Sequence, residues 1–333
     1  MSRLGLPVAV DIREVGPRDG LQIEAPVPTA GKLRLLDALV STGIRRIEAT
    51  AFVSPRAVPC MADAEAVAEY VTSVPGVEWS ALAAGPGGVR RALDAGIRTI
   101  EYVVSASDGH SRANARRSTA EAIAAVEEIA ARVHDAGGCC EVILATAWDC
   151  PFDGPTPPAR VAELAARAVE LGADQLCLAD TIGTAGPARV VGLVETVRTA
   201  VASVRLPVPL GAHFHNTRGM GLANALAAAQ AGVAQLDASV GGMGGCPFAP
   251  GASGNIATEE LVYLLDDAGV STGVDLDRML DAAALAQELV GHPLDSNVLR
   301  AGGRSGPRPA PGPNRAAVVG SGREPTGAGD AVR

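Results

Sequence analysis

Two histidines, His213 and His215, stand one residue apart in a chain that has only five histidines. In a strand, residues i and i+2 project to the same face, so both imidazoles would point into one space and could share a metal ion. Hydrogen-bonded core histidines are the ordinary alternative, but a His-x-His pair at a strand end favours a metal site. The remaining histidines, His110, His134 and His292, have no such partner, and we expect the last two at the surface.

The other ligands of this site are predicted to be oxygen atoms. No Cys-x-x-Cys pattern supplies thiolates, and Cys139-Cys140 begins a predicted strand, at the end away from the expected site. Asp19 and Asn255 are the remaining candidates. Two imidazoles with a carboxylate and an amide suit Mg²⁺ or Mn²⁺ better than a structural zinc ion.

Asp19 follows Arg18 in the segment GPRDG, residues 16–20. Turn-forming residues frame the charged pair, which places it just past the first predicted strand. A functional pair is one interpretation. The alternative is a helix-capping Asp19 beside a solvated Arg18.

A glycine-rich segment, GGMGGCP, occupies residues 241–247. It lacks the Lys-Ser/Thr ending of a phosphate-binding loop, which disfavours nucleotide hydrolysis. A mobile lid that carries Cys246 as a proton donor is the functional interpretation. A tight turn with a buried cysteine is the alternative, because free cysteine commonly behaves as a small apolar residue.

The elements that must position these residues alternate between strand and helix. Eight β-rich runs are predicted at 8–15, 44–50, 77–83, 99–105, 141–147, 175–180, 208–215 and 234–240. Helical stretches are predicted at 29–42, 61–72, 87–95, 119–136, 159–171, 188–201, 220–231 and 258–267, with a further helix at 275–290 on the outside. The count of eight predicts an α/β fold of the (β/α)8 TIM-barrel type, and a doubly wound open sheet is the alternative.

In such a barrel the active site lies at the carboxyl ends of the strands. Polar side chains gather there: Arg18, Asp19, Glu48, Asp180, His213 and His215, with Asn255 in the loop after the last strand. The glycines that repeat before strands, as in GIRRIE at 43–48 and GIRTIE at 96–101, are expected to end helices in the left-handed conformation.

The composition excludes several classes. The 333 residues carry a net charge of −9 and only 3% aromatics, which argues against nucleic acid and an anionic membrane as partners. No apolar run is long enough for a membrane span, and the first ten residues do not resemble a secretory signal. Six cysteines are too few for a disulfide scaffold, so we expect a cytoplasmic protein.

The last 33 residues contain 8 Gly and 5 Pro and no periodic apolar face. We expect residues 1–300 to form the catalytic barrel domain and residues 301–333 to form a low-complexity, disordered tail.

Five segments together resemble the 3-hydroxy-3-methylglutaryl-CoA lyase family, within the DRE-TIM metallolyases. They are residues 14–22 (EVGPRDGLQ), 48–55 (EATAFVSP), 213–215 (HFH), 244–247 (GGCP) and 251–255 (GASGN). The resemblance runs from about residue 8 to about residue 300. It implies cleavage of a 3-hydroxyacyl-CoA thioester to acetyl-CoA and a keto acid, acetoacetate for the named substrate. It also implies a dimer or a higher homo-oligomer.

The resemblance also implies residue roles. Asp19, His213, His215 and Asn255 would hold the divalent cation, Mg²⁺ or Mn²⁺. Arg18 would stabilise the enolate oxygen, and Asp19 or a histidine such as His213 would take the hydroxyl proton. Cys246 would take part in proton transfer, Glu48 and Asp180 would orient the ligands, and Gln22, Arg18 and Asp180 would contact the substrate.

Some positions depart from the family pattern and leave the acyl group open. His215 is followed by Asn216-Thr217-Arg218 rather than Asp-Thr, and Met243 lies in the glycine-rich segment. A related thioester such as citramalyl-CoA is therefore an alternative substrate. For the CoA moiety, Arg112, Arg116 and Arg117 are candidate contacts, or else a solvated basic run.

Two other functions compete with a lyase. A condensing acyl-CoA synthase of the same superfamily is one, although such enzymes usually carry a long C-terminal regulatory region and this chain ends in a short tail. A catalytically silent binding protein is the other, and the complete set of expected site residues counts against it.

Overall fold

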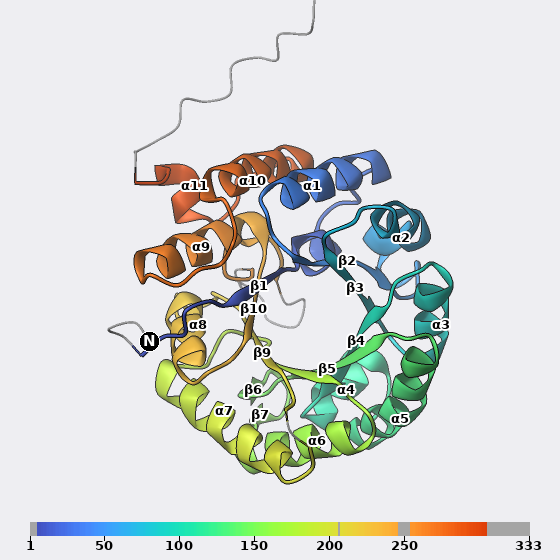
Figure 1. Cartoon of the computed structure of the whole chain (residues 1–333). Coiled ribbons are helices and arrows are strands. Elements are labelled where there is room, and N and C mark those ends of the chain that lie inside the picture. The colour runs from blue at the N-terminus through green and yellow to red at the C-terminus, as the bar shows by residue number, and fades with distance from the viewer. Residues whose placement is uncertain (1–4, 206, 246–253, 305–333) are drawn as a thin grey trace, which may run out of the picture.

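The computed structural model describes residues 5–205, 207–245 and 254–304. Eight parallel strands close into a barrel in the order β1-β10-β9-β8-β5-β4-β3-β2 (Figure 1), which confirms the predicted TIM-barrel fold. The strands are β1 (Asp11–Glu14), β2 (Arg46–Phe52), β3 (Glu78–Ala83), β4 (Thr99–Ser105), β5 (Cys139–Ala145), β8 (Gln175–Asp180), β9 (Leu210–Phe214) and β10 (Gln235–Ala238).

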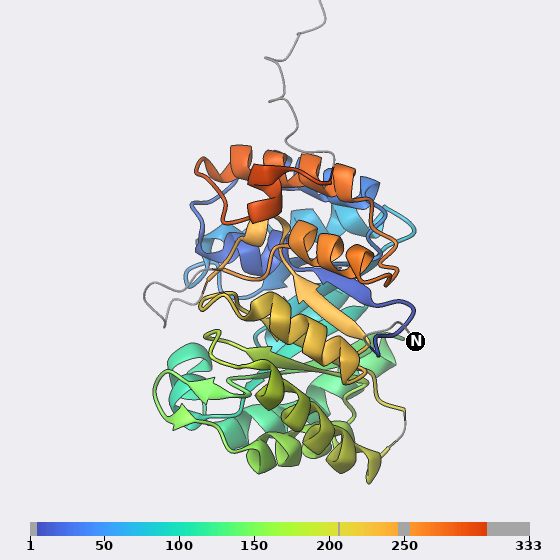
Figure 2. The ribbon, with the colours of Figure 1, turned by 90° about the vertical axis from the view of Figure 1, so that its left-hand side faces the viewer.

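Helices form a ring around the barrel (Figures 1 and 2). They are α1 (Thr29–Ser41), α2 (Ala64–Thr72), α3 (Pro86–Asp94), α4 (Asp108–Ala115), α5 (Thr119–Asp135), α6 (Pro158–Glu170), α7 (Pro187–Ala202), α8 (Gly221–Gln230), α9 (Thr258–Asp267), α10 (Leu276–Val290) and α11 (Asn297–Ala301). The additional helix α10 packs against α1 and α9, as expected for a helix on the barrel's outside. No helix among the described residues is long and apolar enough to cross a membrane.

Glycines set the repeating joints between helices and strands. Gly43, Gly96, Gly172 and Gly232 have φ of +88°, +93°, +108° and +83°. Each stands two residues after the end of a helix and three residues before an inner strand. Because this left-handed conformation strains residues that carry a Cβ, glycine is the residue suited to these positions. The joints predicted from the repeated sequence are confirmed.

The first turns of several helices are also stabilised by residue types suited to those positions. Proline occupies the first turn of α3, α6 and α7, where its missing N–H would be unpaired in any case. The α5 helix begins with a capping box, in which Ser118 and Glu121 satisfy each other's backbone N–H groups.

The loop after β4 is more structured than predicted. It holds the short helix α4, and the loop after β5 holds an antiparallel pair, β6 (Asp149–Cys150) and β7 (Gly154–Pro155). Among the predicted helices, α2 begins at Ala64 rather than at residue 61, because Pro59–Met61 form a separate 3₁₀ turn. The predicted disordered tail lies outside the described residues, apart from its first four residues.

The barrel interior is not uniformly apolar. Large apolar side chains such as Phe52, Ile100 and Phe214 fill the space between the strands and the helices. A small apolar group, Ile143, Cys177 and Ala179 with Val103, forms a separate cluster. The chain also buries a network of charges from several strands, which we call the Arg13 cluster: Arg13, Glu101, Glu141 and Asp237.

Candidate active site

The Arg18–Asp19 pair lies on a single π-helical turn, η1 (Gly16–Gly20), directly after β1. The carbonyl of Val15 accepts hydrogen bonds from the backbone N–H groups of Arg18, Asp19 and Gly20 at 3.1, 2.7 and 3.2 Å. Such turns are rare and frequently mark functional sites. Arg18 and Asp19 are each only 7% exposed, so the alternative of a solvated arginine beside a helix cap is wrong.

Glu14, the last residue of β1, holds this turn in place through hydrogen bonds to its carboxylate. Its carboxylate accepts hydrogen bonds from Gly16 N, Val240 N and Thr258 Oγ1 at 2.7, 2.8 and 2.6 Å. A Cβ at Gly16 would lie 2.6 Å from Glu14 Oε1, so a larger residue would not fit. Burial, only partly offset by these bonds, raises the pKa of Glu14 to about 7.

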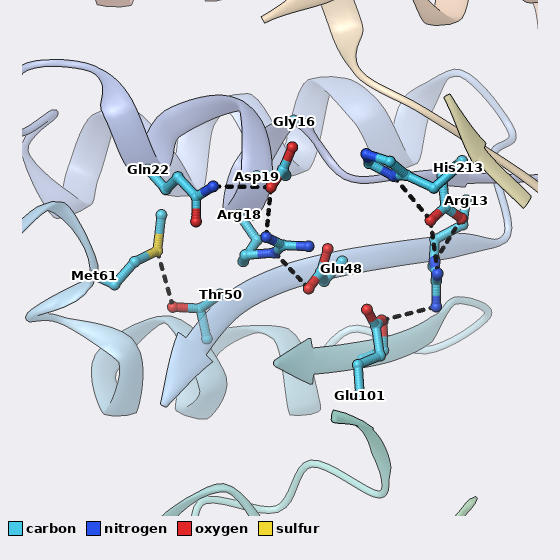
Figure 3. Close-up of polar contacts among 12 residues, drawn as sticks. Arg13, Gly16, Arg18, Asp19, Gln22, Glu48, Thr50, Met61, Glu101 and His213 are labelled. Carbon is cyan, nitrogen blue, oxygen red and sulfur yellow. Dashed lines mark hydrogen bonds and ion pairs between the residues drawn. The ribbon is translucent and has the colours of Figure 1, made fainter. Parts of the chain in front are cut away.

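Arg18 is held on two sides by carboxylates (Figure 3). Its Nε donates to Glu48 Oε1 at 2.5 Å, and its Nη1 donates to Asp19 Oδ1 at 2.6 Å. Burial disfavours the charged guanidinium, but Glu48 and Asp19 outweigh it and raise the pKa of Arg18. Arg18 therefore stays charged in a nearly water-free position.

Asp19, His213 and His215 meet at the carboxyl end of the barrel, and one ligand atom from each lies within 4.8 Å of the others. The two imidazole centroids are 5.2 Å apart, and His215 Nε2 lies 4.0 Å from Asp19 Oδ2. All three residues are buried. The predicted approach of the two histidines, from His213 within β9 and His215 just after it, is therefore observed.

Asn255 completes this group, which we call the mouth cluster: Asp19, His213, His215 and Asn255. Asn255 pairs with His215 in an isolated β-bridge, and its Nδ2 donates to Asp19 Oδ2 at 2.8 Å and to Met243 O at 3.0 Å. Gly244, at φ +111°, comes so close that a Cβ there would lie 2.7 Å from Asn255 Nδ2. The glycine-rich segment thus allows the backbone to pack directly on the amide.

The mouth cluster fits a divalent cation. Asn255 Oδ1 and His215 Nδ1 are buried, and neither has a hydrogen-bond partner in the described part of the chain. Buried polar atoms without partners are rare, and a carboxylate, an amide oxygen and two imidazoles could together hold Mg²⁺ or Mn²⁺. These four residues are the ones that the sequence singled out.

The charges of the cluster suit this use. Burial acts to raise the pKa of Asp19, but Arg18, the two histidines and the Asn255 amide lower it overall. Burial, with His213 close by, lowers the pKa of His215 to about 4. At neutral pH the cluster thus presents an ionised carboxylate and a neutral His215 imidazole, which are the forms that bind metals.

Gln22 and Asp180, both predicted to contact the substrate, differ in their contacts with the mouth cluster. Gln22 reaches the cluster, since its Nε2 donates to Asp19 Oδ1 at 3.0 Å. Asp180, at the end of β8, accepts hydrogen bonds from Thr184 N and Ala185 N, both at 3.0 Å, and so fixes the loop between β8 and α7. The structure brings Gln22 and Glu48 to the site directly, whereas the contacts of Asp180 are with its own loop.

The basic run after β4 is divided among several contacts. Arg112 lies 3.6 Å from Asp108 on the exposed side of α4, and Arg116 takes a left-handed conformation at the end of that helix. Arg117 Nη1 donates to the hydroxyl of Tyr102 at 3.2 Å. A contact between this run and CoA therefore stays a prediction. Cys246 lies outside the described residues.

Sequence reasoning missed two buried groups. His110 Nδ1 lies 2.6 Å from Ser105 Oγ, and His110 is only 4% exposed. Its burial was missed because the helix that carries it, α4, was not predicted. The Arg13 cluster was also missed. One signal could have found it: a charged residue lies inside three predicted strands, at Arg13, Glu101 and Asp237, and another, Glu141, begins a fourth.

Comparisons with known proteins agree over nearly the whole barrel. The family model described as HMGL-like matches residues 9–286. The chain is 40% identical over 296 residues to hydroxymethylglutaryl-CoA lyase YngG of Bacillus subtilis, covering 88% of this chain and 97% of that protein. It is also 40% identical over 305 residues to (R)-citramalyl-CoA lyase of Chloroflexus aurantiacus, covering 88% of this chain and 95% of that protein.

Among solved structures, the fold matches an HMG-CoA lyase from Acinetobacter baumannii in complex with coenzyme A and 3-methylmalate. The TM-score is 0.84 and the sequence identity 38%, with 93% of this chain and 100% of that chain covered.

Proposed function

We propose that this chain, which belongs to the HMGL-like family, is a divalent-metal-dependent carbon–carbon lyase that cleaves 3-hydroxy-3-methylglutaryl-CoA to acetyl-CoA and acetoacetate. The observation that carries the proposal is the mouth cluster, with the unpartnered Asn255 Oδ1 and His215 Nδ1 beside the buried, charged Arg18. A retro-Claisen cleavage needs a deprotonated tertiary hydroxyl, a stabilised thioester enolate and a proton for that enolate.

Asp19, His213, His215 and Asn255 would hold the cation. A bound Mg²⁺ or Mn²⁺ would lower the pKa of the substrate hydroxyl and anchor the substrate. Asp19 and His213 are the candidate bases for the hydroxyl proton, since both are buried within the cluster. The hydrogen bond from Gln22 Nε2 keeps the Asp19 carboxylate in one orientation.

Arg18 is proposed to stabilise the enolate oxygen. Among the described residues it bonds through Nε and Nη1 only, which leaves Nη2 for a substrate oxygen. Glu48 and Asp19 already fix the guanidinium plane, so little reorganisation is needed when the negative charge develops.

The proposed proton donor to the enolate is Cys246. The segment before it is anchored, because Val240 N and Gly241 N donate to Glu14 Oε1 and Glu259 Oε2 at 2.8 and 3.0 Å. The segment that follows is anchored at Asn216 N, which donates to Gly254 O at 3.0 Å. These bonds fix described residues on both sides of Cys246, which supports the proposal that its thiol is brought near the mouth cluster.

The alternative substrate is citramalyl-CoA, which the 40% identity to an (R)-citramalyl-CoA lyase favours. Its cleavage would be the same reaction, but the keto acid released would be pyruvate rather than acetoacetate.

One assay separates these proposals. Purified protein with Mg²⁺ or Mn²⁺ is offered a panel of 3-hydroxyacyl-CoA thioesters, and acetyl-CoA and the keto acid are both quantified. Acetoacetate from the 3-hydroxy-3-methylglutaryl thioester supports the first substrate, and pyruvate from the citramalyl thioester supports the second. Condensation of acetyl-CoA with a keto acid and water to a hydroxy acid and free CoA, without carbon–carbon cleavage of any thioester in the panel, would instead identify a synthase. No turnover and no cation binding would overturn the proposal.

We also propose a cytoplasmic location, a homo-oligomeric assembly and a barrel domain that ends near residue 300. The described cysteines Cys60, Cys139, Cys140, Cys150 and Cys177 are all free thiols, which supports a reducing compartment.

A further inference from the structure

Three neighbouring strands place Arg13, Asp237 and His213 side by side. In the register of the barrel, Arg13 of β1 pairs with Asp237 of β10, and Asp237 pairs with His213 of β9. Side chains at paired positions of adjacent strands lie next to one another on the same face of a sheet. The three residues therefore form a row across β1, β10 and β9, and His213 is the member that belongs to the mouth cluster.

The Asp237 carboxylate contacts both Arg13 and His213. Arg13 donates from Nε to Asp237 Oδ1 at 2.9 Å and from Nη2 to Oδ2 at 2.8 Å, a two-pronged pairing that prevents the carboxylate from rotating. His213 Nδ1 lies 3.2 Å from the same Oδ2. Figure 3 shows His213, Arg13 and Glu101 joined through this line of contacts.

Arg13 is in turn immobilised by the rest of its cluster. Its Nη1 lies 3.0 Å from Glu101 Oε1 and also contacts Glu141 Oε2. All four residues of the Arg13 cluster are at most 2% exposed. The position of the Asp237 carboxylate is thus determined by a buried, fully charged partner and not by solvent.

We propose that Asp237 is a positioning residue for the metal site: it accepts the Nδ1 proton of His213, so that Nε2 carries the lone pair toward the cation, and Arg13 holds Asp237 in that orientation. A carboxylate behind a metal-binding histidine fixes both the tautomer and the ring angle. The inference rests on the metal site proposed above.

The two histidines of the mouth cluster are therefore held differently. The Nδ1 atom of His213 has a charged acceptor, whereas the Nδ1 atom of His215 is buried without a partner in the described residues. Of the two imidazole rings, only that of His213 has a described hydrogen bond that fixes its orientation. We therefore expect the contact with Asp237 to have a large effect on metal affinity.

The substitution Asp237→Asn tests this arrangement. Both carboxylate oxygens of Asp237 act as acceptors, for Arg13 and for His213, whereas an asparagine has only one acceptor oxygen. If that oxygen faces Arg13, the amide nitrogen faces His213 and favours the wrong tautomer, with the proton on Nε2. The matched control is Glu141→Gln, because Glu141 also contacts Arg13, is equally buried, and is not bonded to His213.

Mn²⁺ binding to the full-length, chelator-stripped protein is measured by electron paramagnetic resonance titration. We expect Asp237→Asn to weaken Mn²⁺ binding by about 10- to 100-fold, the usual effect of losing such a carboxylate, while Glu141→Gln changes it by less than about threefold. Unchanged affinity in Asp237→Asn would overturn the proposal, and so would an equal loss in both variants.

A second measurement does not depend on a variant of Asp237. ¹⁵N-histidine NMR of the wild-type protein reports the protonated nitrogen of each imidazole, and a His213→Gln sample assigns the signal. Nδ1–H with an unprotonated Nε2 supports the proposal, and the opposite tautomer overturns it. If the wild type binds no Mn²⁺ but His213 shows the expected tautomer, it is the metal site that fails and not the positioning by Asp237.

Discussion

The mouth cluster and the Arg13 cluster are both buried and polar, but they are completed in different ways. In the Arg13 cluster, Glu101, Glu141 and Asp237 each have an oxygen within ion-pair distance of the one guanidinium. In the mouth cluster, Asn255 Oδ1 and His215 Nδ1 have no partner in the described structure. Each carboxylate of the first group thus lies beside a cation of the protein, although neither oxygen of Glu101 makes a hydrogen bond among the described residues, whereas the second group has uncharged atoms available to a ligand. Substitutions in the first should therefore lower stability, and at Asp237 the metal affinity as well, whereas substitutions in the second should change mainly activity.

The largest effect is expected for Arg18→Gln. The substitution removes the permanent charge proposed to meet the enolate, so kcat should fall on the order of 10³-fold or more. Steady-state kinetics of acetyl-CoA release measures it. The control is Arg91→Gln, since Arg91 bonds Glu65 and Val53 O away from the mouth cluster. A near-normal kcat in Arg18→Gln would remove Arg18 from the chemistry.

Next comes Arg13→Met, which leaves three buried carboxylates without their cation. The free energy of unfolding should fall by about 3–5 kcal/mol, as when one partner of a buried ion pair is removed. Urea denaturation measures it. Arg46→Met is the control, because Arg46 is partly exposed and pairs with Asp11 and Glu78 at 3.6 and 3.4 Å, so its loss should cost at most about 1 kcal/mol. Equal losses would mean that the buried Arg13 cluster contributes no more to stability than a partly exposed ion pair.

Glu14 gives a pH-dependent test. Its pKa is raised from 4.5 to about 7 because it is buried, so the folded protein binds this proton more tightly than the unfolded chain does. The associated stability is present below pH 4.5 and is lost as the pH rises through 7, by about 3 kcal/mol at one pKa unit per 1.36 kcal/mol.

In Glu14→Gln the amide can replace the protonated carboxyl, so this pH-dependent loss should disappear. Denaturation curves between pH 4.5 and 7.5 for both proteins measure the difference. Glu259, the neighbouring carboxyl whose pKa is raised to about 6, is present in both and cancels. Parallel pH profiles would mean that Glu14 does not titrate in this range.

The smallest effect is expected for Gln22→Ala. It removes one hydrogen bond, of 3.0 Å, from Asp19 without removing a ligand. A bond to a charged group contributes about 1.5 kcal/mol, so kcat/KM should fall about tenfold, with little change in unfolding free energy. A loss as large as that of Arg18→Gln would place Gln22 in direct contact with the reaction.

The sequence predicted the barrel and the mouth cluster because both leave local signals. A strand–helix alternation with glycine joints marks the fold, and polar residues that follow apolar runs mark the site. Arg13 and Asp237 left only a weak signal, since a charge in a short strand is normally read as solvated, and their pairing spans 224 residues. Asp180 was placed correctly at a strand end, but its orientation toward Thr184 depends on a loop geometry that no pattern reveals.

The hydrogen bond between Asn255 and Asp19 joins residues 236 positions apart, and that between Thr258 and Glu14 joins residues 244 apart. Contacts between such distant segments are slow to form, because the entropy of closing the long loop between them is lost before the contacts stabilise the chain. The complete mouth cluster therefore needs residues from both ends of the barrel sequence, where β1 pairs with β10. A chain not yet synthesised as far as Asn255 would lack part of the proposed cation site, so its full metal affinity is expected only when synthesis is nearly complete.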